Sequence, residues 1–562
     1  HSTILFRAPY NADADPTEHE EIWPMIVASR RNYLFVGESI DPNDWQSNVT
    51  ADQIYQRVID GVHHEDGHII LLHDAGGSSR KPTLDALPRI IETLQHEGYQ
   101  FISLEQYLGM NKQTLMPEIN KGKAYYAMQT NLWLAEMIYH VSDFLTALFL
   151  VFLALGMLRL IFMYVLMIRE KRAENRRNYA PIDAATAPTV SIIVPGYNEE
   201  VNIVRTITTL KQQDYPNLHI YFVDDGSKDH TLERVHEAFD NDDTVTVLAK
   251  KNGGKASALN YGIAACRSEY VVCIDADTQL KNDAVSRLMK HFIADTEKRV
   301  GAVAGNVKVG NQRNMLTYWQ AIEYTSSQNF DRMAYSNINA VTVVPGAIGA
   351  FRKEVIEAVG GFTTDTLAED CDLTMSINEH GYIIENENYA VALTEAPETL
   401  RQFVKQRIRW CFGVMQAFWK HRSSLFAPSK KGFGLWAMPN MLIFQYIIPT
   451  FSPLADVLML IGLFTGNALQ IFFYYLIFLM IDASVSIMAY IFEGERLWVL
   501  LWVIPQRFFY RWIMYYVLFK SYLKAIKGEL QTWGVLKRTG HVGPHPPTPS
   551  PRERGSAGNN LL

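Results

Sequence analysis

The stretch Val190-Ser191-Ile192-Ile193-Val194-Pro195 is a nearly continuous apolar run, and it determines the predicted fold. Strands that are apolar on both faces are typical of parallel sheets covered by helices on both sides. Further strands of this kind are predicted at 219–224, 244–249, 269–275 and 300–305, with helical patterns between most of them. The sequence therefore predicts a mainly parallel, doubly covered α/β sheet within residues 189–425.

Carboxylates follow two of these predicted strands. The first strand ends in Asp224-Asp225, and the second is followed by Asp275-Ala276-Asp277. Ligands of such sheets bind at the carboxyl ends of the strands. Carboxylates one residue apart suit Mg²⁺ or Mn²⁺, and such a cation in turn takes diphosphate oxygens as ligands. A single motif is equally typical of a surface loop, but two at successive strand ends favour a metal and diphosphate site.

The segment between these motifs reads Lys250-Lys251-Asn252-Gly253-Gly254-Lys255-Ala256. Glycines let a backbone approach a phosphate, and lysines supply positive charge. The phosphate loop of nucleotide hydrolases does not match, because Ala249 stands where its first glycine is required and Ala256 where it needs Ser or Thr. No G-x-G-x-x-G follows the first strand, which disfavours a dinucleotide-dependent oxidoreductase.

Three carboxylates crowd the stretch Leu367-Ala368-Glu369-Asp370-Cys371-Asp372. Such a cluster repels itself unless a metal, a cationic ligand or a proton transfer uses it. The alternative is a solvated acidic turn that opens a helix, where carboxylates are favoured. Because the stretch follows two strand-end motifs, we favour chemistry, with Asp370 as the candidate base and Asp372 as a structural residue.

A third group of polar residues lies on one face of a later helix. Gln406, Arg409 and Trp410 share that face because they are three and four residues apart. Arg409 could grip a diphosphate with its planar fork, and Trp410 could offer a flat apolar face to a sugar ring. The alternative is an amphipathic helix lying on a membrane surface.

The regions that flank this domain are apolar enough to meet a membrane. Residues 144–168 contain one cation, Arg159, and are long enough to span a bilayer. Cations cluster directly after them, so the positive-inside rule places residue 169 onward in the cytoplasm and the preceding module outside. Apolar blocks at about 437–465, 468–492 and 497–525 are expected to be interfacial or transmembrane, and they are interrupted by Pro439, Pro449, Pro453 and Pro505.

Composition excludes several classes of protein. At 562 residues the chain has room for two or three domains, and its net charge of −7 gives no indication of nucleic-acid binding. The cysteines contain no C-x-x-C pair, which disfavours a zinc site, and their confinement to the middle of the chain suits a reducing compartment; they are Cys266, Cys273, Cys371 and Cys411.

These patterns divide the chain into successive segments. We expect a partial α/β domain at 1–115, a transmembrane helix at 140–170, the sheet domain at 189–425, interfacial and transmembrane helices at 430–528, a short segment at 529–540 and a disordered tail at 541–562. The first domain is predicted to contain strands at 3–6, 68–72 and 98–102 and a helix at about 83–97. Residues 1–10 read as the middle of a folded domain, so we expect that an upstream part is missing.

The ordered motifs resemble those of the processive family 2 glycosyltransferases, a group that includes cellulose, chitin, hyaluronan and poly-N-acetylglucosamine synthases. The matching stretches are Pro195-Gly196-Tyr197-Asn198-Glu199, Asp224-Asp225-Gly226, Gly253-Gly254-Lys255, Asp275-Ala276-Asp277, Glu369-Asp370 and Gln406-x-x-Arg409-Trp410. The family's usual Thr-Glu-Asp is here Ala368-Glu369-Asp370. The resemblance implies a GT-A (Rossmann-like) cytosolic domain embedded between membrane helices.

The resemblance also implies a role for each residue. Asp370 would take the proton from the acceptor hydroxyl, supported by Glu369, while Asp277 with Asp275 would bind the metal on the diphosphate. The remaining residues would bind nucleotide and sugar: Tyr197, Glu199 and Asp224 or Asp225 the uridine, Lys255 the nucleotide, Gly346 the acceptor as part of a nearby loop, and Gln406, Arg409 and Trp410 the diphosphate and acceptor. Residues 533–540 resemble the family's gating segment, which closes over the nucleotide.

The first domain resembles the C-terminal part of NodB-like polysaccharide deacetylases. The matches are Phe6-Arg7-Ala8-Pro9-Tyr10, Asp41-Pro42-Asn43-Asp44-Trp45 and Leu71-Leu72-His73-Asp74. The resemblance implies that His73 is a general acid oriented by its neighbours and that Arg7, Asp44 and Trp45 remain from the family's site. The family's aspartate base and metal-binding Asp-His-His precede these motifs and are absent from this sequence, so deacetylation by this module alone is not expected.

Together these features predict a membrane-embedded, inverting, processive transferase in the cell membrane. It would polymerise a β-linked polysaccharide from UDP-N-acetylglucosamine in the cytoplasm, using Mg²⁺ or Mn²⁺, and pass the chain outward past an extracytoplasmic N-terminal domain. Its partners would be the UDP-sugar donor, the growing polysaccharide and the lipid bilayer, with no nucleic acid. Three alternatives stay open: a cellulose-type synthase using UDP-glucose, a deacetylase as the main activity of a longer parent chain, and a degenerate transferase that serves as a polymer channel.

Overall fold

The computed structural model describes residues 3–8, 19–64, 67, 69–74, 79–177, 179–463 and 468–527. The predicted gating segment at 529–540 and tail at 541–562 lie outside the described residues, as do Pro9 and Tyr10. The chain divides into two compact units, His1–Thr146 and Ala147–Leu562.

The second unit contains the predicted parallel strands. They are β3 (Val190–Gly196), β4 (Leu218–Asp224), β5 (Val245–Ala249) and β6 (Tyr270–Cys273), paired in parallel in the order β5-β4-β3-β6. All seven residues of β3 are buried. Successive residues of β3 enter two different core clusters, with Ile193 in one and Ile192 and Val194 in the other, because side chains alternate between the two faces of a strand. The prediction of a doubly covered sheet is confirmed.

The sheet is mixed: four of its seven strand pairings among the described residues are parallel, as predicted, and three are antiparallel. Within the described residues the sheet has eight strands in the order β5-β4-β3-β6-β9-β8-β10-β7. In its second half β9 (Gly349–Arg352) is antiparallel to β6 and to β8 (Val300–Val309), and β10 (Ile383–Thr394) is parallel to β8 and antiparallel to β7 (Gln279–Leu280). The sequence missed β7 and β9 because they are very short, and β10 because polar residues interrupt its apolar pattern.

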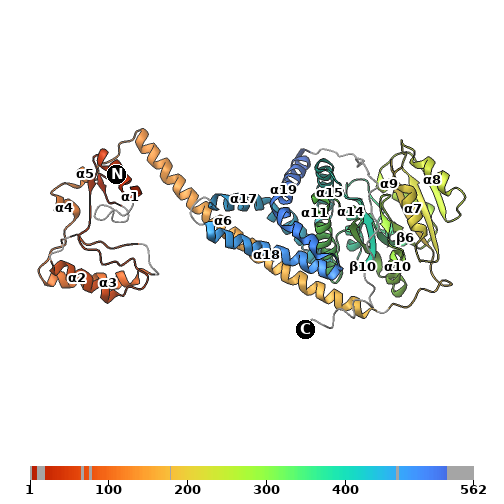
Figure 1. Ribbon diagram of the computed structural model, residues 1–562, viewed down its shortest axis with the longest axis horizontal. Coiled ribbons are helices and arrows are strands. Elements are labelled where there is room, and N and C mark those ends of the chain that lie inside the picture. The colour runs from red at the N-terminus through yellow and green to blue at the C-terminus, as the bar shows by residue number, and fades with distance from the viewer. Residues whose placement is uncertain are drawn as a thin grey trace. The chain divides into compact units, whose positions relative to one another are not determined.

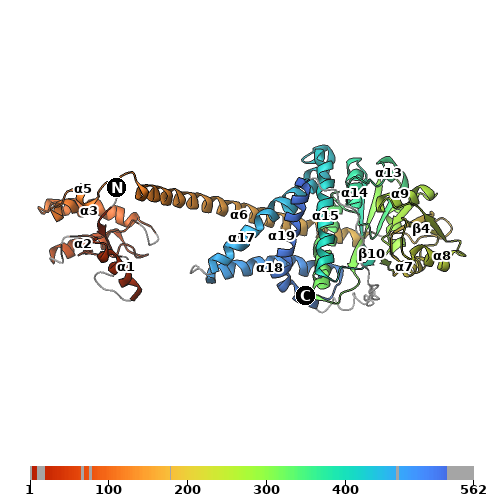
Figure 2. The same ribbon diagram turned by 90° about the horizontal axis from the view of Figure 1, so that it is seen from above.

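Helices cover both faces of the sheet. Beside the strands β3 to β5 lie α7 (Ile203–Lys211), α8 (Thr231–Phe239) and α9 (Lys255–Ala265) (Figure 1). Helix α10 (Ala284–Ala294) packs on β8 and β10. The later part of the domain adds α11 (Met315–Glu323), a π-helical turn η2 (Tyr324–Asn329), α12 (Phe330–Ser336), α13 (Lys353–Ala358), α14 (Glu369–Glu379) and α15 (Leu400–Lys420). Figures 1 and 2 both show α15 between the sheet and the C-terminal helices.

Apolar helices surround this domain in the chain. They are α6 (Lys123–Arg176), α17 (Ile448–Leu463), α18 (Ala468–Glu493) and α19 (Val503–Lys527), with the irregular turns η5 (Phe433–Ala437), α16 (Met438–Asn440), η6 (Met441–Ile447) and η7 (Leu497–Trp502). The π-helical turns η5 and η6 flank Pro439, as expected where a proline removes a helical hydrogen bond. By length and hydropathy, two helices of the described chain could cross a membrane, Tyr125–Arg176 and Phe433–Leu460.

Arg159, the cation within the first apolar segment, faces other helices. Its guanidinium donates to Asp331 Oδ2 at 2.9 Å and to Asn440 Oδ1 at 2.8 Å. On the same helix Tyr164 bonds Ser484 of α18 at 2.9 Å, so the second half of α6 packs along α18. Arg159 therefore lies among other helices of the described chain.

The first unit is mostly helical. Its elements are β1 (Leu5–Phe6), α1 (His19–Arg30), β2 (Leu34–Phe35), α2 (Ala51–His63), α3 (Lys81–His96), α4 (Leu104–Leu108) and α5 (Lys112–Leu115). The predicted helix at 83–97 is confirmed as α3, and the strand at 3–6 as the short β1. The predicted strand at 98–102 is wrong, since residues 98–102 form no strand and Phe101 and Ile102 are exposed. Of the predicted strand at 68–72, the described part forms a single bridge between Ile70 and Ile40.

Candidate functional site

The carboxyl edge of strands β4, β3 and β6 gathers the predicted site residues. Asp224 is the last residue of β4 and lies opposite Gly196, the last residue of β3. Tyr197 and Glu199 directly follow β3, and Asp275 and Asp277 follow β6. Because parallel strands end at the same edge of a sheet, these residues share one side of the domain.

Two adjacent aspartates at this edge have different surroundings. Asp225 is saturated by one loop: it accepts hydrogen bonds from the Lys250 ammonium at 2.7 Å and from the backbone N–H groups of Gly253 and Gly254 at 3.0 and 2.7 Å. Asp224 accepts from the N–H groups of Gly226 and Ser227 through Oδ2 only. Its Oδ1 is buried and has no hydrogen-bond partner among the described residues. Of the two candidates for uridine binding, the free acceptor belongs to Asp224, while Asp225 shapes the loop before α9.

The turn that carries Tyr197 and Glu199 is fixed to the turn after β4. Asn198 has a left-handed backbone with φ of 57°, its N–H donates to Ser227 Oγ at 3.0 Å, and its side chain accepts from Lys228 N–H at 2.8 Å. The N–H of Glu199 donates to Thr231 Oγ1 at 2.8 Å. Tyr197 remains half-buried beside them. The residues predicted to hold the nucleotide base are thus brought together by two interlocked turns.

Lys255 lies at the centre of the site. It opens α9, and its ammonium contacts Asp275 Oδ1 at 2.6 Å and Glu369 Oε1 at 3.1 Å. Burial alone would lower the pKa of Lys255, but the carboxylates of Asp275, Glu369 and Asp370 outweigh it and raise that pKa. Lys255 therefore links the Asp-Ala-Asp motif to the acidic start of α14, two stretches that are far apart in the sequence.

Gly346 lines the site beside the Lys255 ammonium. A Cβ atom added there would lie 2.5 Å from Lys255 Nζ, 3.6 Å from Asp370 Oδ2 and 3.7 Å from Asp275 Oδ1. The Gly346 N–H donates to Asp370 Oδ2 at 3.2 Å. Gly346 is thus within contact of all three functional groups, and any side chain would displace the lysine.

Asp370 has the environment of a proton acceptor. Burial is the main cause that raises its pKa from 3.8 to about 6, and the charge of Glu369 adds to it, while Lys255 and the N–H groups of Cys371 and Gly346 oppose the shift. A carboxylate with a pKa near neutral accepts a proton more readily than an ordinary aspartate and is still ionised at pH 7. The geometry therefore suits general base chemistry at Asp370 and leaves Glu369 paired with Lys255.

Asp275 and Asp277 fit a hard divalent cation by donor chemistry. Asp277 is 3% exposed, and the Asp275 side chain is 32% exposed, so the pair offers one buried and one accessible carboxylate. In the present structure the positive charge beside Asp275 is supplied by Lys255. Carboxylate oxygens are the ligands that Mg²⁺ and Mn²⁺ prefer.

Helix α15 carries the predicted Gln406, Arg409 and Trp410. Gln406 is buried, Arg409 is half-buried, and the Trp410 ring lies 6.3 Å from the ring of Tyr324 in the π-helical turn. The sequence missed Arg407, which is almost wholly buried. Its guanidinium lies 4.3 Å from the Trp410 ring and donates to Glu323 Oε2 at 2.7 Å.

Glu323 also accepts from Tyr510 of α19. Glu323, Arg407 and Tyr510 thus hold α15 to α11 and α19, and the Arg407 guanidinium lies against the Trp410 ring. No pattern in the sequence indicated it, since its three members are far apart in the chain.

In the first unit the structure brings together two of the four predicted residues. His73 Nδ1 lies 2.7 Å from Asp44 Oδ1, and the buried Asp44 also accepts from Thr83 Oγ1 at 2.8 Å. Arg7 is paired with Glu38 instead, and Trp45 is 47% exposed. Asp41, Asp44 and His73 offer ligand atoms within 4.8 Å of one another, but Arg80 also contacts Asp44, and a neighbouring guanidinium disfavours a cation there.

Residues 191–360 match the family model "Glycosyl transferase family 2". This part of the chain is similar to the family 2 glycosyltransferases. Among curated proteins, the poly-beta-1,6-N-acetyl-D-glucosamine synthase of Staphylococcus epidermidis is 32% identical over 260 residues, which is 46% of this chain and 62% of the relative. The synthase of the same name from Staphylococcus aureus strain COL is 33% identical over 224 residues, 40% of this chain and 54% of the relative.

The matched region thus spans less than two thirds of either relative. Among solved structures, a mannosyltransferase from Pyrobaculum calidifontis in complex with GDP-Man and Mn²⁺ is 24% identical and covers 62% of this chain and 95% of its own, with a TM-score of 0.44. The family-model match over residues 191–360 runs from β3 to β9, where most of the candidate site lies.

Proposed function

We propose that the chain is a polysaccharide synthase that transfers N-acetylglucosamine from UDP-N-acetylglucosamine to a growing β-linked chain with inversion. The observation that carries this proposal is the position of Asp370, a half-buried carboxylate held by the Gly346 N–H at the carboxyl edge of the sheet. The relatives that are named poly-beta-1,6-N-acetyl-D-glucosamine synthases support the sugar and the polymer.

The transfer needs one base and one charged site for the leaving group. Asp370 takes the proton of the acceptor hydroxyl while that oxygen forms a bond to the anomeric carbon from the face opposite the diphosphate. The bond between the anomeric carbon and the diphosphate breaks, and its electron pair leaves with UDP. Inversion follows because a single displacement occurs, with no nucleophile of the enzyme between donor and acceptor.

Residues around Asp370 supply binding and charge. The unpaired Oδ1 of Asp224 suits the uracil N–H, with Tyr197 and Glu199 beside it. A bound Mg²⁺ or Mn²⁺ would neutralise the diphosphate from Asp277 and Asp275. On the other side of the site, Gln406 and Arg409 would hold the leaving diphosphate and Trp410 the acceptor sugar ring.

The same proposal places the protein in the cell membrane as a multi-pass protein. The apolar helix Tyr125–Arg176 and the stretch Phe433–Leu460 would cross the bilayer, and the cations at the end of α6 would keep the transferase domain in the cytoplasm. The polymer would leave between these helices, and the N-terminal unit would then be extracytoplasmic.

The proposal is tested with purified protein in detergent, given labelled UDP-N-acetylglucosamine and Mg²⁺ or Mn²⁺. We expect labelled polymer and free UDP, and neither product after the divalent cation is chelated. UDP-glucose in a parallel reaction is expected to give no polymer. Incorporation from UDP-glucose alone would overturn the donor, and Asp277→Ala with unchanged activity would overturn the metal site.

A second candidate activity rests on the Asp44–His73 pair. An imidazole held by a buried carboxylate suits proton transfer, as a deacetylase of the emerging polymer would require. We propose that this pair belongs to a deacetylase site whose other groups lie outside the described residues. Release of acetate from an N-acetylglucosamine oligomer, and its loss in His73→Ala, is the expected result.

A further inference from the structure

The acidic stretch that contains Asp370 has a second carboxylate with a separate set of contacts. Asp372 is wholly buried, and it lies on a different side of α14 from Asp370 because residues two apart on a helix do not share a face. Asp370 faces Gly346 at the candidate active site, whereas Asp372 faces the end of α15. Because both residues belong to α14, the contacts that hold Asp372 also hold the helix that carries Asp370.

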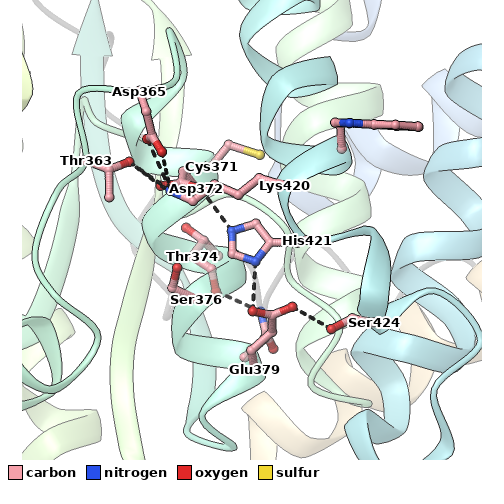
Figure 3. A network of polar contacts seen from close by, with 12 residues as sticks. Thr363, Asp365, Cys371, Asp372, Thr374, Ser376, Glu379, Lys420, His421 and Ser424 are labelled. Atoms are coloured by element: carbon pink, nitrogen blue, oxygen red, sulfur yellow. Dashed lines mark hydrogen bonds and ion pairs between the residues drawn. The ribbon is translucent and has the colours of Figure 1, made fainter.

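Asp372 is held by residues at the end of α15 (Figure 3). Its Oδ1 accepts from His421 Nε2 at 3.0 Å and its Oδ2 from Lys420 Nζ at 2.9 Å, and Thr363 Oγ1 also donates to Oδ2. His421 Nδ1 lies 2.8 Å from Glu379 Oε2, at the last turn of α14. The imidazole of His421, the residue that follows α15, thus contacts both the first and the last turn of α14.

The contacts of His421 define its charge state. Both ring nitrogens face carboxylate oxygens, which cannot donate, so both must carry protons and the ring is an imidazolium. Burial works to lower the pKa of His421, but the hydrogen bonds to Asp372 and Glu379 outweigh it and raise that pKa to about 9. The imidazolium and the Lys420 ammonium together balance the buried Asp372 and the partly buried Glu379.

The charged and polar groups that face this cluster come from every element packed around it. They are Asp372 and Glu379 of α14, Lys420 of α15, Ser424 and Lys430 of the following turns, and Thr363 and Asp365 of the loop before α14. Asp365 contacts Lys420 at 3.1 Å and the Thr363 side chain, on the exposed side of the cluster. His421 is therefore the group that connects the inner carboxylates.

The face of α15 that approaches α14 is the face that carries the predicted donor-binding residues. Gly413 lies so close that a Cβ there would be 2.7 Å from Ala368 N, and Gln416 Oε1 accepts from Leu367 N–H at 3.1 Å. Gln406, Gly413 and Lys420 are seven residues apart, so they follow one line along the helix. Any rotation or sliding between α14 and α15 would change the position of Asp370 relative to Gln406 and Arg409.

We propose that His421 is a positioning residue for sugar transfer: by bridging Asp372 and Glu379 it locks α14, which carries Asp370, against α15, which carries Gln406, Arg409 and Trp410. This inference rests on the proposed function for its catalytic consequence. In this proposal His421 does not contact the reacting atoms. It acts on the distance between the base Asp370 and the residues that would bind the diphosphate, Gln406 and Arg409.

His421→Gln tests the proposal, with His380→Gln as the matched control. His380 is exposed and directly follows α14, the helix that His421 bridges. Its ring nitrogen Nδ1 lies 2.8 Å from Ser376 O, in the last turn of that helix. We expect His421→Gln to lower kcat about tenfold or more, since a displacement of about 1 Å costs up to about a hundredfold, with the KM for donor changed by less than about twofold. His380→Gln is expected to match the wild type. Unchanged kcat in His421→Gln, or a rise in KM that accounts for the whole loss, would overturn the positioning role.

A charge-keeping variant separates positioning from folding. His421→Arg keeps two donors toward the two carboxylates and does not titrate. The raised pKa of His421 means that its contribution is complete below its unfolded value and is lost as pH rises through about 9. We expect wild-type kcat to fall severalfold between about pH 7 and about pH 10, and His421→Arg to keep its kcat over that range. Equal losses in both proteins would contradict the proposal, even where His421→Gln does not fold.

The two proposals fail in different ways. If the wild type releases no UDP from any donor, the proposed function fails. The thermal midpoint of the wild type and of His421→Arg can still be compared between the same two pH values. A pH-dependent midpoint in the wild type alone would support the clamp, and parallel midpoints would overturn it.

Discussion

At the scale of single residues, the candidate site depends on space as much as on charge. Gly346 is needed because of what lies beside it: its backbone contacts Asp370, and the space where a Cβ would be is filled by the Lys255 ammonium. Lys255 in turn joins Asp275 to Glu369. Adding a single methyl group at Gly346 therefore tests whether the position of Lys255 matters for transfer.

Gly346→Ala is expected to reduce transfer with little loss of stability. The added methyl group would displace Lys255 Nζ, the end of a flexible side chain, while its distances to Asp370 and Asp275 are ordinary contacts. We expect kcat to fall about tenfold to a hundredfold, as for other displacements near reacting groups. The check is kcat together with the thermal midpoint, with Gly156→Ala, whose added Cβ meets nothing within 4 Å, as the control. Wild-type kcat in Gly346→Ala would show that the position of Lys255 is not critical.

The pH dependence of transfer reports on Asp370. Burial and the charge of Glu369 raise its pKa to about 6, and the base must be ionised to accept a proton. We therefore expect kcat to rise with pH through about 6 and to level off before the fall expected where His421 loses its proton, at about 9. Removing the negative charge with Glu369→Gln should move this rise to lower pH. A profile that is flat between about pH 5 and 7 would exclude Asp370 as the titrating base.

The sequence indicates which residue types form the site but not which of two neighbouring residues binds a ligand and which supports the structure. Asp224 and Asp225 are adjacent carboxylates at one strand end, and only the contacts of the loop 250–254 show that Asp225 is occupied while Asp224 keeps an unpaired oxygen. The helix pattern indicates Arg409 and not Arg407, because such a pattern shows which face a residue lies on but not how deeply its side chain is buried. The ion pair with Glu323 is a contact over 84 positions, which no local pattern can indicate.

At the scale of elements, α15 has a supporting side and a functional side. Arg407 binds Glu323 of α11 on the supporting side, and Gln406, Gly413 and Lys420 follow the side that faces α14. A change on the supporting side should therefore act first on stability.

Arg407→Met tests that division. The Arg407 side chain is 2% exposed, so its loss leaves the Glu323 carboxylate without its partner cation, which typically costs about 3–5 kcal/mol. We expect a large drop in the thermal midpoint in detergent and its partial recovery in the double variant Arg407→Met, Glu323→Gln. Arg401→Met, on an exposed arginine of the same helix, should be neutral. A double variant that is no more stable than Arg407→Met would show that the ion pair is not the cause.

The strands show why part of the fold was predictable. β3, β4 and β6 are apolar on both faces, and such runs are distinctive. β9 has only four residues and includes Arg352, which is buried beside Glu269 and Asp295. A strand with a buried cation has no apolar pattern, so the antiparallel half of the sheet appears only once the long-range partners are known.

At the scale of the whole molecule, the sheet domain is the part on which sequence, structure and comparisons agree. The ordered motifs over residues 195–410, the mixed sheet and the family-model match over 191–360 concern the same domain. The flanking apolar helices were predicted from hydropathy, and two of them meet the criteria for a membrane span. The N-terminal unit was predicted least well, because its strands are two residues long and its helices are short.

The central claim is that Asp370 acts as the base of a sugar transfer. Its most direct test is the rate of UDP release from UDP-N-acetylglucosamine by the wild type and by Asp370→Asn, an isosteric variant that cannot accept the proton. The account predicts UDP release and polymer by the wild type and a loss of about a hundredfold to ten-thousandfold in Asp370→Asn, with donor binding retained. Wild-type rates in Asp370→Asn would contradict it.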